Sequence, residues 1–190
     1  MNDDCSEGDS NPELPLDFQA FYLCRQELYH DYATELLGDR KEAEELVHEV
    51  FSLILEDWDD LLGCRNFEED TWAILRLAAI RRLRKKHRRP AFVAKGAFAQ
   101  ALDATRDQLM ALEESIGLYS AIAQLPAKQF DVIVLRYVLG YETRVIAWFL
   151  GLDRRTVDYH GRKGKEHLRQ QLNLPETPRT PRGRAKEANK

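Results

Sequence analysis

Polar and basic side chains gather in one short segment of this sequence, around a single apolar residue, Val157. They are Arg154, Arg155, Thr156, Tyr159, Arg162 and Lys163. Arginine can reach phosphates and guanine edges, and a helix with this set in its first turns suits the major groove of DNA. The segment therefore favours a nucleic-acid-binding helix, although basic residues on a helix face are often only solvated.

The residues before this segment predict how it is positioned. A short apolar helical stripe comes first: Ile146, Ala147 and Leu150. Gly151 breaks the stripe, and Asp153 can cap a second helix that begins at Arg154. We therefore interpret residues 140–168 as a DNA-binding helix-turn-helix, with an ordinary pair of helices as the alternative.

No other residues are spaced for catalysis. The sequence has no nucleophile with its base, no phosphate-binding loop, and five histidines without an HExxH or other ligand pattern. We therefore expect no enzyme activity, no metal and no cofactor. Three cysteines are too few and too scattered for a disulfide framework, which favours a reducing cytoplasm.

The composition favours an all-α protein. The 190 residues are 44% hydrophobic and 32% charged, which is enough for one domain or two small ones. Because the net charge is -4, the chain is no polycation, and any DNA contact must come from a local patch. The acidic N-terminus lacks the pattern of a signal peptide and no run reaches membrane-spanning length, so we expect a soluble, intracellular protein.

An acidic helix is predicted from Asp39 to about Glu56, after an aromatic-rich helix that runs from Leu16 to Gly38. Its two faces differ in character. Apolar residues at helical spacing form the buried face, and the solvent face presents Glu42, Glu45, His48, Glu49 and Glu56. Residues 39–70 carry twelve carboxylates against three basic side chains. Such a face avoids DNA and can dock on a basic protein surface, or it is simply solvated.

A basic helix end is predicted next. The third helix starts near Phe67, seven of the nine residues 81–89 are Arg or Lys, and Pro90 stops the helix. Charge this dense favours phosphate, whereas complementing the helix dipole needs only one or two cations. An alanine-rich linker follows, then helices at 109–125 and 127–138.

Two stretches together resemble a known family. Asp39-Arg40 followed by AEELVHEVF (43–51) is similar to the clamp-binding helix in region 2 of sigma-70 family factors of the small ECF (extracytoplasmic function) type. AIAQLPAKQFDVIVLRYVLGY (121–141), continued by IAWFLGLDRRTV, resembles region 4 of the same proteins. The resemblance implies a bacterial sigma factor with two small helical domains, which binds core RNA polymerase and directs promoter-specific initiation. The expected organisation is a disordered acidic leader at 1–15, region 2 at 16–90, a linker at 91–108, region 4 at 109–172 and a disordered tail at 173–190.

The resemblance also implies roles for individual residues. Contact with the clamp helices of the polymerase beta-prime subunit is implied for Glu44, Glu45, His48 and Glu49. Contact with the minus 35 promoter element is implied for Arg154, Arg155, Thr156, Asp158, Tyr159, Arg162 and Lys163, beside a contact of region 4 with the beta flap. In the minus 10 region the implied residues are Arg65, Asn66, Arg76, Arg81, Arg82, Arg84 and Lys85. Core polymerase and promoter DNA are the implied partners, and an anti-sigma factor is an expectation from the family alone.

A few positions depart from the family pattern. Ile80 stands where asparagine is usual, and residues 68–70 place negative charge in the loop expected to meet DNA. Gly161 replaces a large apolar residue and Gly164 follows it; each glycine costs a helix about 0.5 to 1 kcal/mol relative to alanine, which predicts a looser recognition helix. Two alternatives therefore stay open: a degenerate sigma-like protein-interaction module and a stand-alone helix-turn-helix regulator.

Overall fold

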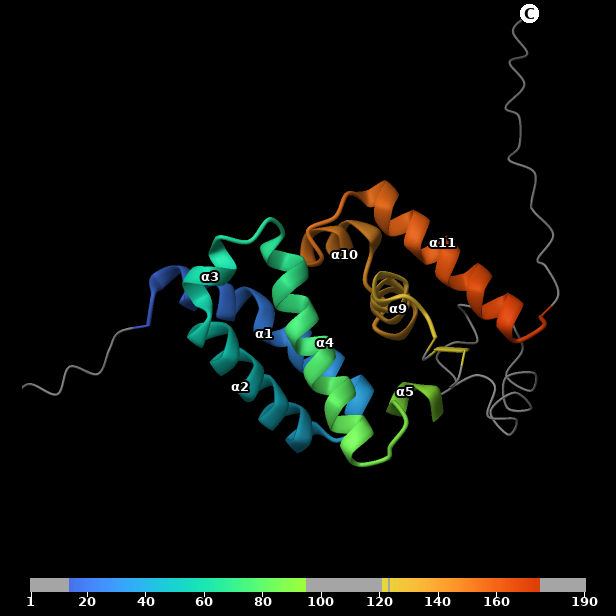
Figure 1. The fold of residues 1–190 in the computed structure, drawn as a ribbon, viewed down its shortest axis with the longest axis horizontal. Coiled ribbons are helices and arrows are strands. Elements are labelled where there is room, and N and C mark those ends of the chain that lie inside the picture. The colour runs from blue at the N-terminus through green and yellow to red at the C-terminus, as the bar shows by residue number, and fades with distance from the viewer. Residues whose placement is uncertain (1–13, 95–120, 123, 175–190) are drawn as a thin grey trace, which may run out of the picture. The chain divides into compact units, whose positions relative to one another are not determined.

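The structure is a computed structural model that describes residues 14–94, 121–122 and 124–174 (Figure 1). In chain order its elements are α1 (Leu16–Leu37), α2 (Arg40–Glu56), α3 (Trp58–Leu62), α4 (Phe67–Lys85), α5 (Ala91–Ala94), α9 (Ala127–Ile133), the π-helix η1 (Val134–Val138), α10 (Thr143–Phe149) and α11 (Arg154–Gln171). The predicted all-α class is confirmed for these residues. The predicted leader, the tail and most of the linker lie outside them.

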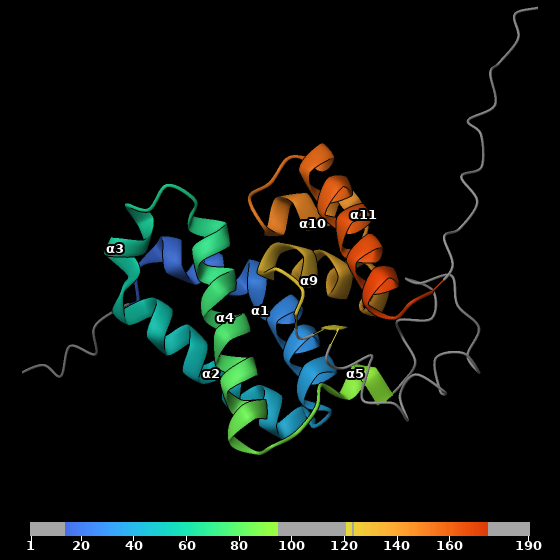
Figure 2. The ribbon, with the colours of Figure 1, turned by 45° about the vertical axis from the view of Figure 1, so that its right-hand side comes forward.

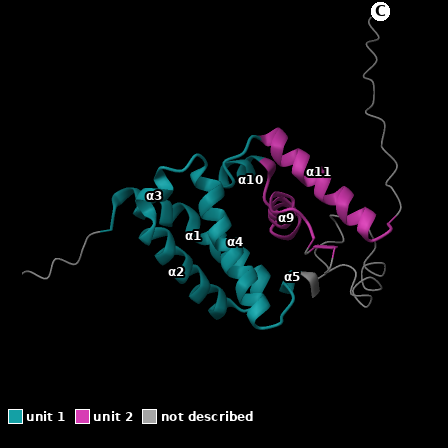
Figure 3. Ribbon diagram, in the orientation of Figure 1, with its two compact units in different colours: residues 1–92, 144–153 teal, residues 93–143, 154–190 magenta. Residues whose placement is uncertain are grey.

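The chain divides into two compact units, which are coloured separately in Figure 3. Unit 1 comprises residues 1–92 and 144–153, and unit 2 comprises residues 93–143 and 154–190. Within the described ranges, none of the helices combines the length and the apolar character that crossing a membrane requires.

The junction between α1 and α2 follows the predicted cap signals. Gly38 ends α1 in the left-handed region, at φ 72°, and donates its backbone N–H to the carbonyl of Thr34 at 2.8 Å. Asp39 then caps α2, because its side chain accepts a hydrogen bond from the backbone N–H of Glu42 at 2.8 Å. A glycine stop followed directly by a capping residue needs no further loop. The two helices therefore lie antiparallel as a hairpin (Figure 2).

An aromatic core holds unit 1 together, as the spacing in α1 predicts. The rings of Phe18 and Trp58 meet edge to face with their centroids 5.1 Å apart. Deeper in the unit, Tyr29 stacks on Phe51 at 5.1 Å and meets Trp72 at 5.8 Å. Pairs of this kind contribute about 0.5 to 1.5 kcal/mol beyond their burial. They fix α1, α2 and α4 side by side, as both ribbon views show.

Two boundaries in unit 1 differ from the prediction. No helix was predicted between about Glu56 and Phe67, but α3 forms there and buries Trp58 and Leu61. The basic helix was expected to reach Pro90, yet α4 ends at Lys85. His87 adopts a positive φ of 50°, which an α-helix does not contain, so the chain turns back before the proline.

Unit 2 is organised around the packing of α9 on α11 (Figure 2), and η1 continues α9 along the chain. The predicted helix at 127–138 is present, but its second half is a π-helix. The backbone N–H of Leu139 reaches the carbonyl of Val134, five residues earlier, at 3.1 Å. Turns of this type are rare and frequently mark functional positions.

Candidate nucleic-acid and protein interfaces

The predicted recognition helix, α11, is strongly two-sided. Its buried residues recur at helical spacing: Val157, Gly161, Gly164 and Leu168. The residues predicted to contact DNA lie on the other side, where Arg154, Arg155, Asp158, Tyr159 and Arg162 are exposed, and Thr156 and Lys163 are partly exposed. The structure thus brings the whole predicted set onto the solvent side of one helix.

The turn that leads into α11 is a tight one. The backbone N–H of Leu150 donates to the carbonyl of Ile146 at 3.0 Å, and that of Leu152 to the carbonyl of Ala147 at 2.9 Å. Between them Gly151 adopts φ +61°, a conformation that L side chains rarely adopt. The predicted order of helix, glycine turn and second helix is confirmed.

Asp158 is engaged within unit 2. Arg136, from the π-helix, donates from Nη2 to Oδ1 of Asp158 at 2.8 Å and to Oγ1 of Thr143 at 2.6 Å. Asp158 was predicted to contact DNA; its side chain is 64% exposed, and its carboxylate also pairs with Arg136. Arg136 was not predicted from the sequence, where its one signal is that it is the lone cation in the largely apolar run of residues 130–141.

A basic groove runs along α11 on the side of the π-helix. It has a volume of about 780 Å³, and five cations line it against two carboxylates: Arg136, Arg162, Lys163, Lys165 and Arg169 against Asp158 and Glu166. Glu166 pairs with Lys163 at 2.8 Å and raises the pKa of that lysine, so Lys163 keeps its charge. The surplus of positive charge next to the recognition helix suits phosphate.

The two glycines of α11 have a packing role. A Cβ atom on Gly164 would lie 2.8 Å from Cγ1 of Ile133, and one on Gly161 would lie 3.0 Å from Nη1 of Arg136. The sequence predicted a looser helix at these positions. The structure instead gives a reason for the glycines: they let α11 approach α9 and η1 closely.

The four residues predicted to bind the polymerase lie on the exposed side of α2. Glu45 and His48 are exposed. Glu44 pairs with Arg40 one turn earlier at 3.1 Å, a surface pair of small energetic value. Glu49 accepts two hydrogen bonds from Nη2 of Arg82, at 2.7 and 2.6 Å. Glu49 and Arg82 were assigned to different interfaces, and the structure joins them directly.

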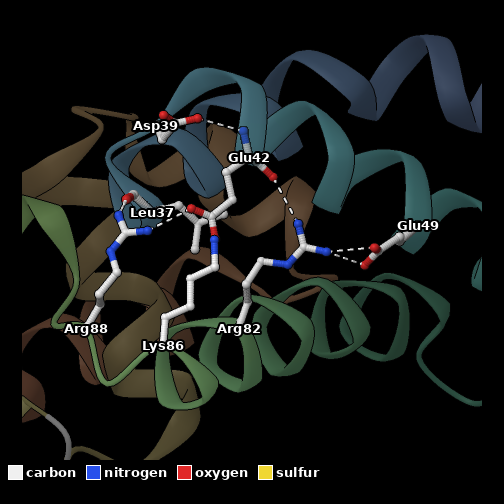
Figure 4. A network of polar contacts seen from close by, with 7 residues as sticks. All are labelled: Leu37, Asp39, Glu42, Glu49, Arg82, Lys86 and Arg88. Atoms are coloured by element: carbon white, nitrogen blue, oxygen red, sulfur yellow. Dashed lines mark hydrogen bonds and ion pairs between the residues drawn. The ribbon is translucent and has the colours of Figure 1, made fainter.

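Glu42 was predicted to lie on the solvent face of α2, and that prediction is wrong. Its residue is 8% exposed, and its two carboxylate oxygens pair with Lys86 at 2.9 Å and Arg88 at 2.7 Å. Arg88 also donates to the carbonyl of Leu37, and Arg82 donates to the backbone carbonyl of Glu42 at 3.2 Å (Figure 4). Burial by itself would raise the pKa of Glu42, but the two cations outweigh it and hold that pKa below its ordinary value.

The basic end of α4 is consequently divided between two uses. Arg82, Lys86 and Arg88 are held by acidic groups of α2, whereas Arg81, Arg84 and Lys85 are exposed. These cations were predicted from the sequence to form one phosphate-binding patch. The structure shows that part of the charge fastens α4 to α2.

The other residues assigned to the minus 10 region differ in their surroundings. Arg65 is exposed, and Arg76 is partly buried in α4. Asn66 caps α4: its Oδ1 accepts from the backbone N–H of Glu69 at 3.2 Å, and its Nδ2 donates to Oε2 of Glu69 at 2.9 Å. Asn66 therefore has a structural role whether or not it meets DNA.

Comparison with known proteins gives a family for the C-terminal part. Residues 116–168 match the family model of sigma-70, region 4. Among solved structures the chain is similar to the sigma factor RpoE of Bartonella quintana, solved in complex with the anti-sigma factor NepR, at 18% identity and a TM-score of 0.40, over 84% of this chain and 99% of that one. No curated protein matches the sequence significantly. The match to sigma-70 region 4 supports the resemblance to ECF-type factors of the sigma-70 family for residues 116–168.

Proposed function

We propose that the protein is an ECF-type sigma factor that binds core RNA polymerase and directs it to specific promoters. The observation that carries the proposal is α11: a helix of a sigma-70 region 4 whose solvent side gathers Arg154, Arg155, Tyr159 and Arg162. These side chains can reach base edges and phosphates together when the helix enters the major groove. No covalent chemistry is required of the chain itself.

The minus 35 element is the proposed target of α11. Arg154, Arg155, Thr156, Tyr159, Arg162 and Lys163 make the contacts, and Asp158 acts through Arg136 to orient the helix. The surface of α4 that carries Arg65, Arg76, Arg81, Arg84 and Lys85 tracks the opened strand near the minus 10 element, as cations do in other single-strand sites. Arg82 joins them only when its pair with Glu49 opens.

The acidic side of α2 is the proposed docking face for the beta-prime clamp helices. Glu45, His48 and Glu44 are exposed enough to meet a basic surface, and Glu49 can exchange Arg82 for a cation of the partner. Region 4 would also bind the beta flap. A protein with this function works in the cytoplasm. Its region 2 would comprise residues 16–90 and its region 4 residues 109–172. An anti-sigma factor would inhibit it by covering the exposed sides of α2 and α11.

Glu45→Lys tests the docking face most cleanly, because Glu49→Lys would also release Arg82. We expect Glu45→Lys to lower the affinity for purified core polymerase at least tenfold, since reversing a contact charge costs several kcal/mol at an interface. Glu27→Lys on α1 changes the net charge equally and is exposed, so it is the matched control. Equal binding by both variants would contradict the assignment.

A further inference from the structure

Asp158 on α11 is held within unit 2 through one of its two carboxylate oxygens. Nη2 of Arg136 donates to Oδ1 at 2.8 Å, and the hydroxyl of Thr143 approaches the same oxygen at 3.4 Å. Within the residues that the structure describes, no donor reaches the second oxygen, Oδ2. Because a carboxylate offers about four lone-pair sites, Asp158 keeps the capacity to accept a hydrogen bond from another molecule.

The two partners of this ion pair differ in exposure. The side chain of Arg136 is 20% exposed, whereas that of Asp158 is 64% exposed. Gly161 makes room for the guanidinium against α11, since a Cβ atom there would lie 3.0 Å from Nη1 of Arg136. The hydroxyl of Thr143 accepts a further hydrogen bond from Nη2 at 2.6 Å. A cation in a fixed position therefore orients a carboxylate that solvent still reaches.

Stability alone accounts poorly for a carboxylate at this position. An ion pair whose acidic partner is this exposed contributes little to the free energy of unfolding. A negative charge on the side of α11 proposed to face DNA is also repelled by the phosphates. Arg136 offsets part of this repulsion, because its Nη2 lies 2.8 Å from the carboxylate. The pair thus allows an acceptor group to approach DNA with little net charge.

The position of Asp158 suits contact with a base edge. It lies near the start of α11, which begins at Arg154, and the first residues of a recognition helix reach bases in the major groove. In that groove guanine O6 and N7 and thymine O4 are acceptors, which repel a carboxylate. Adenine N6 is a donor, but it lies between two acceptors, its own N7 and the thymine O4. Cytosine N4 is a donor with an apolar C–H on one side, so cytosine complements an oriented carboxylate best.

We propose that Asp158 determines base specificity: its Oδ2 accepts a hydrogen bond from the N4 amino group of a cytosine in the minus 35 element, while Oδ1 stays bound to Arg136 and Thr143. This role rests on the proposed function and deepens it, because it names one base that the promoter must carry. The first oxygen orients the helix and the second reads the DNA. Since the carboxylate is oriented before DNA arrives, less conformational entropy is lost on binding.

The first test uses the full-length chain, purified core polymerase and a promoter library whose minus 35 element is randomised. We expect the wild type to prefer cytosine at one position by at least about fivefold, as single mismatches cost in other specific complexes. Asp158→Ala should lose the preference at that position. Asp158→Asn keeps the shape of the side chain, but its amide can pair with adenine N6 and N7, so the preference there should move from cytosine toward adenine.

Glu166→Gln is the matched control. Glu166 also lies on α11 and pairs with a cation, Lys163, at 2.8 Å. Its substitution removes the same charge as Asp158→Asn, and it should change transcription from all members of the library by a similar factor without shifting any base preference. A loss that is equally uniform for both Asp158 variants would show that Asp158 only orients the helix, and would overturn the base contact.

A single-atom change in the DNA gives the second test, which requires no new fold from the protein. Replacing the selected C·G pair by U·A puts the O4 acceptor where the N4 donor stood, without the methyl group of thymine. The wild type should lose at least about fivefold in initiation on this template, and Asp158→Ala should lose little, because it lacks the bond. Equal losses for the two proteins would contradict direct contact.

The outcomes separate this role from the proposed function. Normal initiation with the same base preferences in the wild type and both Asp158 variants would overturn the cytosine contact and leave the proposed function standing. Selection of another base at the position that Asp158 controls would also overturn it. Failure of the wild-type chain to initiate from any member of the library would overturn both.

Discussion

Asp158 illustrates how a residue can face solvent on a recognition helix and still be committed to its own unit. Its carboxylate bridges to Arg136 and lies 3.4 Å from the hydroxyl of Thr143. Arg136 lies twenty-two residues earlier in the sequence, inside an apolar run. No local sequence pattern therefore predicts the ion pair. Spacing could predict which residues share the exposed side of α11, but not which of them another element occupies.

The packing role of the α11 glycines could not be predicted from the sequence either. A substitution at Gly164 tests this role directly. Alanine would gain about 0.5 to 1 kcal/mol of helix propensity, but its Cβ would meet Ile133 at 2.8 Å. Overpacking of this kind typically costs about 1 to 3 kcal/mol, so we expect Gly164→Ala to destabilise unit 2. Thermal unfolding by circular dichroism and hydrogen exchange in α11 measure the effect. Gln170→Ala, at an exposed position of the same helix, is the control, and stabilisation by Gly164→Ala would contradict the packing argument.

Arg155 is the residue that tests base recognition. If its guanidinium reads a base edge, Arg155→Ala should weaken initiation by about 1 to 3 kcal/mol at promoters that carry the preferred base, and little at promoters where that base is changed. Transcription from a set of upstream-element variants measures this directly. A uniform loss across all templates would instead show that Arg155 contacts phosphate.

Among the elements, α2 and α4 show why the capped junction between α1 and α2 could be predicted, whereas the C-terminal end of α4 could not. Gly38 and Asp39 act within their own turn, so the sequence alone places the α1–α2 junction. The end of α4 depends on Glu42, which draws Lys86 and Arg88 back toward α2 from more than forty residues away. The short helix α3 buries Trp58 and Leu61, and tertiary packing of this kind can override local propensity.

The Glu42 cluster predicts how the α2–α4 pairing responds to acid. Because the folded state lowers the pKa of Glu42, its stabilisation is fully present above the unfolded pKa of about 4.3 and is lost as pH falls through the lower folded value. We expect Glu42→Gln to cost about 1 to 3 kcal/mol near pH 7, with the gap to wild type closing below about pH 4.

Tryptophan fluorescence can follow this cluster during urea unfolding, because all three tryptophans, Trp58, Trp72 and Trp148, belong to unit 1. Glu44→Gln breaks only a surface pair and should change stability little at any pH. A gap between wild type and Glu42→Gln that stays constant or widens in acid would show that the ion pairs do not control the pKa of Glu42.

At the scale of the whole molecule, acidic and basic side chains are concentrated on different helices, although the net charge is only -4. The exposed side of α2 is acidic, and the exposed side of α11 is basic. This separation suits a protein that must attach to polymerase through one surface and to DNA through another. It also explains why neither surface alone predicts the function: an acidic helix or a helix-turn-helix is common, and their combination in one chain is informative.

The most direct test of this account is run-off transcription with purified core RNA polymerase and fragmented genomic DNA. The account predicts transcripts with defined 5′ ends when the wild-type chain is added, and their loss with Glu45→Lys under conditions where Glu27→Lys remains active. Binding of the wild-type chain to core polymerase without any specific initiation would contradict it and favour a sigma-like interaction module. Specific DNA binding without polymerase attachment would contradict it in favour of a stand-alone regulator.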